Sequence, residues 1–145
     1  MRADTASQIA TAAANAANLA TITAWIKSGL NNGADVLRQG RGITSSDAAS
    51  DPNHFKAVCV LDNSEIGYTT FGGVAGLTGN EVLVCATVFG DSDLSGVVDS
   101  TDYFCFNNGV TSALTGWLNG DYNYDGLINA ADNALIDRAM GISLC

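Results

Sequence analysis

The sequence has 145 residues, 47% of them hydrophobic, so the chain can bury the core of one ordinary domain or of two small ones. Fifteen acidic residues against six Lys and Arg give a formal net charge of −9. This charge speaks against binding to nucleic acid or to an anionic membrane surface, because both are bound through Lys and Arg. No apolar run approaches the roughly 18 residues of a membrane span, and a single His argues against His-rich zinc sites.

The first ninety residues predict a helix followed by two strands. Within residues 5–30, apolar side chains recur at helical spacing and Gly29 supplies a stop; these are Ile9, Ala13, Ala16, Leu19, Ile22 and Ile26. Residues 31–54 are rich in Gly, Asn, Ser and Asp and are expected to be irregular. The apolar runs 56–61 and 81–89 are bounded by turn residues and predict strands. Residues 1–89 are therefore expected to form a small mixed N-terminal module.

A duplicated segment follows, with an offset of thirty residues. GDSDLSGVVDSTDYFCFNNG begins at Gly90, and GDYNYDGLINAADNALIDRA begins at Gly120. Identical residues recur at this offset, and conservative pairs such as Val98 and Ile128 add to them. The identical pairs are Gly90/Gly120, Asp91/Asp121, Gly96/Gly126 and Asp102/Asp132. So many coincidences at one offset indicate an internal repeat.

Each repeat carries oxygen ligands in the order that a twelve-residue calcium loop requires. Side-chain oxygens fall at positions 1, 3, 5, 9 and 12, Gly stands at position 6, and position 7 offers its backbone carbonyl. The two sets are Asp91, Asp93, Ser95, Val97, Asp99 and Asp102, and Asp121, Asn123, Asp125, Leu127, Asn129 and Asp132. The sequence predicts two Ca²⁺ ions, since several carboxylates crowded into twelve residues repel one another until a cation neutralises them.

A helix is expected after each loop. Asp99 and Asn129 occupy N-cap positions, with Asp102 and Asp132 three residues on, as in a capping box. The helices are expected to end at Asn107-Asn108-Gly109 and at Gly141, and Trp117 is expected to pack the two repeats together. The predicted fold class is α+β: the mixed module 1–89, then an all-α pair of calcium loop–helix repeats over 90–145.

Residues 90–141 resemble a dockerin domain, on the phrases GDxDxxGxVDxxDY and WLNGDYNYDGLINAAD. The stretch from Gly42 through GYTTFGGVAGLTGNEVLV is similar to the tail of large secreted or surface proteins of the planctomycete type. The resemblance implies an extracellular or cell-surface location and a protein partner, a cohesin-like module. That partner is bound through loop positions 10 and 11, which are Ser100 and Thr101 in the first repeat and Ala130 and Ala131 in the second.

Four cysteines, Cys59, Cys85, Cys105 and Cys145, allow three complete pairings. Cys59 and Cys85 each lie in a strand-like run, so a cross-strand bond is reasonable. The approach of dockerin termini implies Cys105–Cys145 as the complement. Reduced, buried thiols are the alternative.

The expected function is non-enzymatic attachment, because the calcium loops use the acidic clusters and no catalytic motif stands elsewhere. A self-assembling subunit of an extracellular filament or surface layer, made of copies of this chain, is the alternative. A carbohydrate-binding module is a third reading, which would need an exposed row of aromatic residues.

Overall fold

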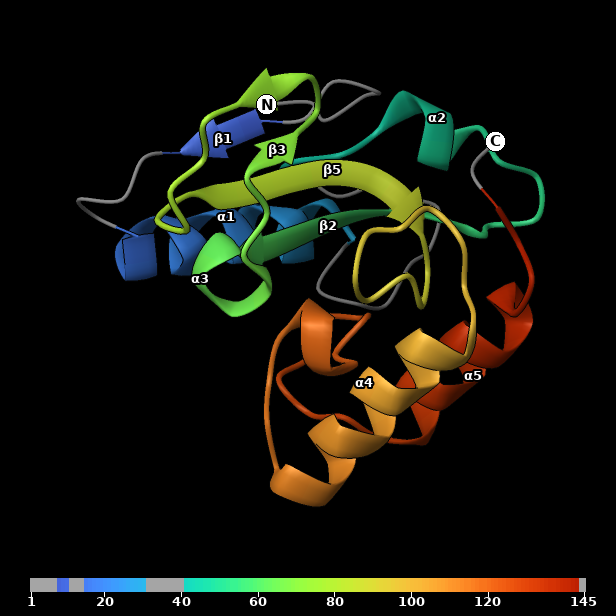
Figure 1. Ribbon diagram of the computed structural model, residues 1–145. Helices are drawn as coiled ribbons and strands as arrows, with labels where there is room; N and C mark the ends of the chain where they lie inside the picture. The colour runs from blue at the N-terminus through green and yellow to red at the C-terminus, as the bar shows by residue number, and fades with distance from the viewer. Residues whose placement is uncertain (1–7, 11–14, 31–40, 144–145) are drawn as a thin grey trace.

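The computed structural model describes residues 8–10, 15–30 and 41–143, and it combines helices with small antiparallel sheets (Figure 1). This mixture agrees with the α+β expectation. The elements in chain order are β1 (Gln8–Ala10), α1 (Asn15–Gly29), α2 (Ser46–Ala49), β2 (Lys56–Asp62), α3 (Asn63–Ile66), β3 (Thr70–Phe71), β4 (Val74–Ala75), β5 (Val82–Val88), α4 (Ser100–Ser112), the 3₁₀ helix η2 (Trp117–Asn119) and α5 (Ala130–Ala139).

The main sheet has the order β1-β5-β2, with both pairings antiparallel. The two strands predicted from apolar runs are confirmed to within a residue or two at their ends as β2 and β5, and their register runs from Lys56↔Val88 to Asp62↔Val82. Residues 57–61 are all buried. Because successive side chains of a strand point to opposite faces, both faces of β2 must be covered. In Figure 1, α1 lies along this sheet.

The predicted N-terminal helix is confirmed in its described part as α1, which ends at Gly29 as expected. Ile26 and Leu30 point into the core and are 0% and 3% exposed. Ile9, which fits the helical spacing, lies instead in β1 and pairs with Leu83 of β5. Pairing with a neighbouring strand has overridden the local helical pattern there. Ala13 and residues 31–40 lie outside the described residues.

The second half of the chain contributes α4, η2 and α5 to the same buried core. Val98, Phe106 and Ile136 are at most 6% exposed and belong to one apolar cluster with the strands β2 and β5. The cluster therefore continues across the proposed boundary between residues 89 and 90. The division into two domains stays a prediction.

The predicted end of the first repeat helix was wrong. Asn107-Asn108-Gly109 lies inside α4, which continues to Ser112 and ends on Ala113 in the left-handed conformation. Gly109 serves close packing instead: a Cβ there would lie 1.9 Å from the carbonyl oxygen of Asn119 in η2. The stop predicted at Gly141 agrees with the structure, since α5 ends at Ala139 and Gly141 has a φ of +76°.

Candidate metal centre

The two predicted loops repeat one backbone conformation. Positive φ angles occur at loop positions 4 and 6 in both copies: +59° at Leu94 and +60° at Tyr124, and +87° at both Gly96 and Gly126. The order of buried and exposed side chains is also identical over residues 101–110 and 131–140. The thirty-residue repeat of the sequence is thus a repeat of structure.

Both capping boxes form as predicted. The side chain of Asp99 accepts from the N–H of Thr101 at 2.7 Å, and that of Asn129 accepts from the N–H of Ala131 at 2.8 Å. In return, one carboxylate oxygen of Asp102 accepts from the N–H of Asp99 at 2.8 Å, and Asp132 accepts from Asn129 at 3.0 Å. These bonds orient the carboxylate at position 12 of each loop and cap the first turn of the helix that follows.

Loop 1, residues 91–102, brings three carboxylates together. One oxygen from each of Asp91, Asp93 and Asp102 lies within 4.8 Å of the others, so this triad can hold a metal ion. Asp91 and Asp102 are 0% exposed, while Asp93 is half-buried. The Oδ1 atom of Asp102 accepts a hydrogen bond from the N–H of Ser92 at 2.7 Å.

Asp91 is the most constrained member of the triad. Its Oδ2 accepts from the hydroxyl of Thr87, at the end of β5, and from the N–H of Gly96 at 3.1 Å. Its Oδ1 is buried, and nothing in the described part of the chain donates a hydrogen bond to it. A buried carboxylate oxygen without a donor is costly, because folding has removed the water that solvated it.

Burial raises the pKa of Asp91 to about 6, and the neighbouring carboxylates of Asp102 and Asp93 add to the rise, while the Thr87 hydroxyl opposes it. Burial also raises the pKa of Asp102. The negative charge of this triad is therefore poorly compensated by the protein alone. A bound cation would supply the missing compensation.

Loop 2, residues 121–132, provides the hydrogen-bond donors to its own Asp121 carboxylate. Asp121 accepts from the N–H of Asp125 at 3.1 Å and from the N–H of Gly126 at 3.1 Å. The side chains of Asn123 and Asp125 bond to each other at 3.0 Å. Burial, followed by the charge of Asp132, raises the pKa of Asp121 to about 6. In loop 2, the side chain at position 1 is therefore buried, whereas the side chains at positions 3 and 5 point toward each other.

The remaining predicted ligands, in both loops, make local contacts. The Ser95 hydroxyl donates to the carbonyl of Val97 at 3.1 Å, so positions 5 and 7 bond to each other. Asp99 serves as a helix cap, as described above. Leu127 is 65% exposed, and its N–H donates to Asp125 at 2.8 Å.

Trp117 packs the two repeats together, as predicted. It is 1% exposed, and its indole N–H donates to the carbonyl of Asp91 in loop 1 at 2.7 Å. Its ring centroid lies 5.2 Å from that of Tyr122 and 5.7 Å from that of Tyr124, both in loop 2. The hydroxyls of Tyr122 and Ser92 add a direct bond of 2.7 Å between the loops.

Sequence reasoning missed the residues that join the loops to the sheet. Thr87 reaches Asp91, and the hydroxyl of Tyr68 donates to the carbonyl of Asp93. Tyr124 donates to the carbonyl of Val58 at 3.0 Å and accepts from the N–H of Val60 at 3.1 Å, along the outer edge of β2. Tyr68 and Tyr124 bond to groups 25 and 66 residues away, so no local pattern marks them. Thr87 lies only four residues before Asp91, and what hid its role is that it belongs to a strand, outside the repeated loop pattern.

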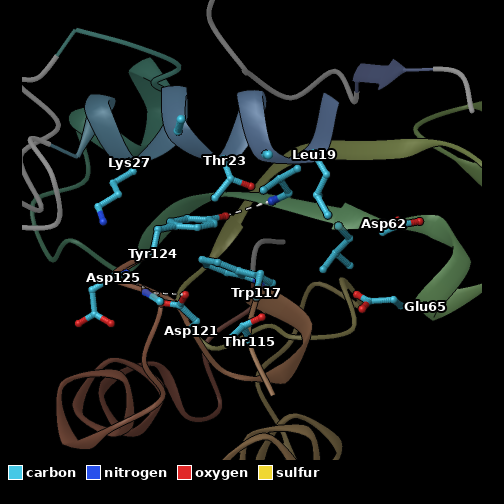
Figure 2. Close-up of a pocket in the computed structure, with 16 residues that line it drawn as sticks. Leu19, Thr23, Lys27, Asp62, Glu65, Thr115, Trp117, Asp121, Tyr124 and Asp125 are labelled. Carbon is cyan, nitrogen blue, oxygen red and sulfur yellow. Dashed lines mark hydrogen bonds between the residues drawn. The ribbon is translucent and has the colours of Figure 1, made fainter. Parts of the chain in front are cut away.

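A cleft of about 580 Å³ lies where α1, the end of β2 and loop 2 meet (Figure 2). Figure 2 shows side chains from these elements around it, and they include Leu19, Thr23, Lys27, Trp117, Tyr124 and Asp121. Because Asp121 and Asp125 stand in its wall, an ion held by loop 2 would border this cleft.

Ser100 and Thr101, the predicted partner residues, are exposed in the first turn of α4. No helix in the described ranges is both long and apolar enough to cross a membrane. Comparison of the chain with family models, curated proteins and solved structures found no match.

Proposed function

We propose that the two loops each bind one Ca²⁺ ion, so that the ions complete the fold of residues 90–145. The observation that carries the proposal is the buried Oδ1 of Asp91, which has no donor within the described residues, beside the carboxylates of Asp93 and Asp102. Three carboxylates with a buried, unpartnered oxygen form a negative site that a cation would neutralise.

The donor chemistry favours calcium over other ions. Every proposed ligand is an oxygen, which suits a hard cation, whereas structural zinc prefers thiolate and imidazole. A twelve-residue loop that turns at a Gly in position 6 wraps an ion with six to eight oxygens, as Ca²⁺ prefers. Mg²⁺ requires a compact octahedron and gives up its waters reluctantly, so it is expected to bind more weakly.

The second ion is supported by the repeat. Loop 2 has the backbone angles of loop 1, a buried Asp121 and the same two-sided fixation of Asp132. Rotation of the Asn123 and Asp125 side chains away from each other would turn both toward an ion. Both are at least partly exposed, so this change requires no repacking of the core.

Titration calorimetry with calcium and with magnesium tests this proposal. We expect two calcium sites, with magnesium weaker, and a melting temperature that falls on chelation. One site adds roughly 2.7 kcal/mol of stability at a hundredfold excess of calcium over Kd. Asp93→Ala should remove one site, whereas Asp47→Ala, outside both loops, should remove neither. No calcium heat, together with a melting temperature insensitive to chelator, would refute calcium binding.

The proposed role of the calcium-loaded repeats is non-enzymatic attachment to a protein partner outside the cell, in the manner of a dockerin. Exposed apolar side chains on the repeats support a protein contact. On α4, Phe104 is 72% and Val110 is 51% exposed, close in sequence to Ser100 and Thr101. Apolar area of this kind is a feature of protein interfaces, and the net charge of −9 disfavours nucleic acid.

Size-exclusion chromatography with light scattering separates attachment from self-assembly. A monomer in calcium that binds a cohesin module supports attachment; large assemblies without any partner support a structural subunit instead. Replacing Ser100 and Thr101 with Arg should abolish the association and leave calcium affinity within a few-fold. The matched control replaces Ala130 and Ala131 with Arg at the same positions of the second repeat. Association that survives the first change and fails with the second would move the contact face to α5.

A further inference from the structure

Two of the four cysteines face each other across the main sheet. Cys59 of β2 and Cys85 of β5 are direct register partners, although 26 residues separate them in the sequence. Their Sγ atoms lie 3.2 Å apart. Cys59 is fully buried, and Cys85 is partly exposed. One thiol of the pair is thus open to reagents in solution, and the other is shielded by the core.

The register supplies the separation that a disulfide requires. Directly opposed residues of antiparallel strands have Cα atoms about 4.5–5.5 Å apart, within the usual range of roughly 4.4–6.8 Å for a disulfide. The two sulfur atoms need to approach by about 1 Å to reach bonding distance. Side-chain rotation covers this difference, so the strands can keep their pairing.

The neighbouring side chains do not complete a metal site around the two thiols. Within the described ranges, the group of metal-ligating side chains that come within 4.8 Å of one another is the Asp91, Asp93 and Asp102 triad, and neither cysteine belongs to it. Two sulfur atoms without a third ligand make an incomplete site for the soft metals that thiolates prefer.

We infer that Cys59 and Cys85 form an intramolecular disulfide when the protein meets a small-molecule disulfide oxidant. In the first step, the Cys85 thiolate attacks the oxidant RSSR, which forms Cys85–S–SR and releases one RS⁻ that takes up a proton. In the second step, the Cys59 sulfur attacks Cys85 Sγ, forms the Cys59–Cys85 bond and expels the second RSH. Two protein thiols lose two electrons, and one RSSR is reduced to two RSH.

Burial sets the order of these steps. Cys85 is the accessible thiol, so it meets the oxidant first. Burial, followed by the adjacent Cys85, raises the pKa of the Cys59 thiol well above its ordinary value. The second step is therefore expected to be slower than the attack of a free thiolate.

The cross-link would tie the edge strand β2 to the central strand β5. The closed loop contains α3, β3 and β4, whose residues lie between the two cysteines in the chain. Closing a loop of this length restricts the unfolded chain, and we expect the oxidised protein to melt roughly 10 °C above the reduced protein.

Peptide mapping of the full chain tests the inference. The reduced protein is incubated with oxidised glutathione, blocked with N-ethylmaleimide in denaturant and digested without reductant. We expect one linked peptide joining Cys59 to Cys85, and Cys59→Ser should abolish both this peptide and the rise in melting temperature. Recovery of Cys59 and Cys85 as maleimide adducts, or a link from either one to Cys105 or Cys145, would overturn the inference.

A variant with the thiol shifted along β2 serves as the control. In the double variant Cys59→Ala with Val60→Cys, the thiol moves one residue along β2 and therefore turns to the opposite face of the sheet. This variant should form no link to Cys85 under the same oxidation. An equally efficient link would show that the register does not determine the pairing. Calcium binding is not involved in either outcome, so the two proposals fail separately.

Discussion

The two loops share one ligand pattern and one backbone conformation, yet they differ in what surrounds them. Loop 1 follows β5 directly, and Thr87, Tyr68 and Trp117 contact its residues from outside the loop. Its Asp91 is fully buried and has an oxygen without a donor in the described part of the structure. In loop 2, the oxygens of Asp121 are bonded by the loop's own N–H groups. The carboxylate at position 1 of the same pattern is thus held partly by a neighbouring strand in loop 1, and by N–H groups of the loop in loop 2.

In these loops, the identity of the ligands and the preorganisation of the site are separate properties. The sequence favours loop 2 at position 5, where it has Asp125 against Ser95 in loop 1. The tertiary structure favours loop 1, because neighbouring elements preorganise its carboxylates before any ion binds. We therefore expect the calcium affinity of loop 1 to depend more on residues outside the repeat than the calcium affinity of loop 2 does.

The largest effect is expected from Trp117→Ala, which removes the side chain that both loops share. Truncation of a buried Trp costs roughly 3–5 kcal/mol of unfolding free energy. The indole also donates to the Asp91 carbonyl, so calcium binding at loop 1 should weaken as well. Trp25→Ala is the matched control: that side chain is 47% exposed, and its loss should change stability by about 0.5 kcal/mol or less. Urea denaturation of both variants decides the matter, and equal losses would contradict the role assigned to Trp117.

Thr87→Val tests whether loop 1 depends on its external donor. Valine keeps the volume of Thr87 and removes the hydroxyl that bonds Asp91. Loss of an outer-shell partner typically weakens metal binding by roughly 10–100-fold, so one of the two calcium affinities should fall by this amount. Titration calorimetry should show the other affinity unchanged. A change in both sites, or in neither, would remove the distinction drawn between the loops.

Tyr124→Phe and Tyr68→Phe compare how firmly each loop is tied to the sheet. The Tyr124 hydroxyl makes two bonds to the edge of β2 and is buried, so its loss should cost about 1.5 kcal/mol. The Tyr68 hydroxyl makes one bond, to the Asp93 carbonyl, from a half-buried position, and should cost about 0.5 kcal/mol. Thermal denaturation in excess calcium measures both. The reverse order would show that loop 1 carries the firmer connection.

Glu81→Gln tests a carboxylate whose negative charge is stabilised by hydrogen bonds from neighbouring protein groups. Hydrogen bonds from Asn63, Thr78 and Gly79 lower the pKa of Glu81 to about 2. Since the folded pKa lies below the unfolded value, the stabilisation is fully present above pH 4.5 and is lost as the pH falls through about 2. Gln should therefore destabilise the protein at pH 7, and its difference from the parent should shrink in acid. Equal differences at pH 7 and pH 3 would contradict the assigned pKa.

Much of the second half of the molecule could be read from local sequence. Each capping box needs only residues three apart, so both were predicted at the correct positions. The glycine at position 6 of each loop, part of the predicted pattern, has a positive φ in both copies. The strands β2 and β5 were also predicted, because burial on both faces requires a continuous apolar run. Local physical chemistry is sufficient for these features.

Other features were decided by contacts between remote segments. Gly109 was expected to end the helix, but α4 continues through it, and the glycine is needed there because a Cβ would lie 1.9 Å from the carbonyl oxygen of Asn119. Ile9 lies in a strand because it pairs with Leu83 of β5. The short helix α2, in a stretch expected to be irregular, begins at a local cap instead, where the Ser45 side chain accepts from the N–H of Ala48. The sequence by itself determined the repeat, the caps and the order of candidate ligands, since each involves residues within one turn or loop. Only the tertiary structure determined that Tyr68 bonds the carbonyl of Asp93 and that Tyr124 bonds the edge of β2 at Val58 and Val60. Each of these pairs brings together residues whose contact depends on the path of the whole chain.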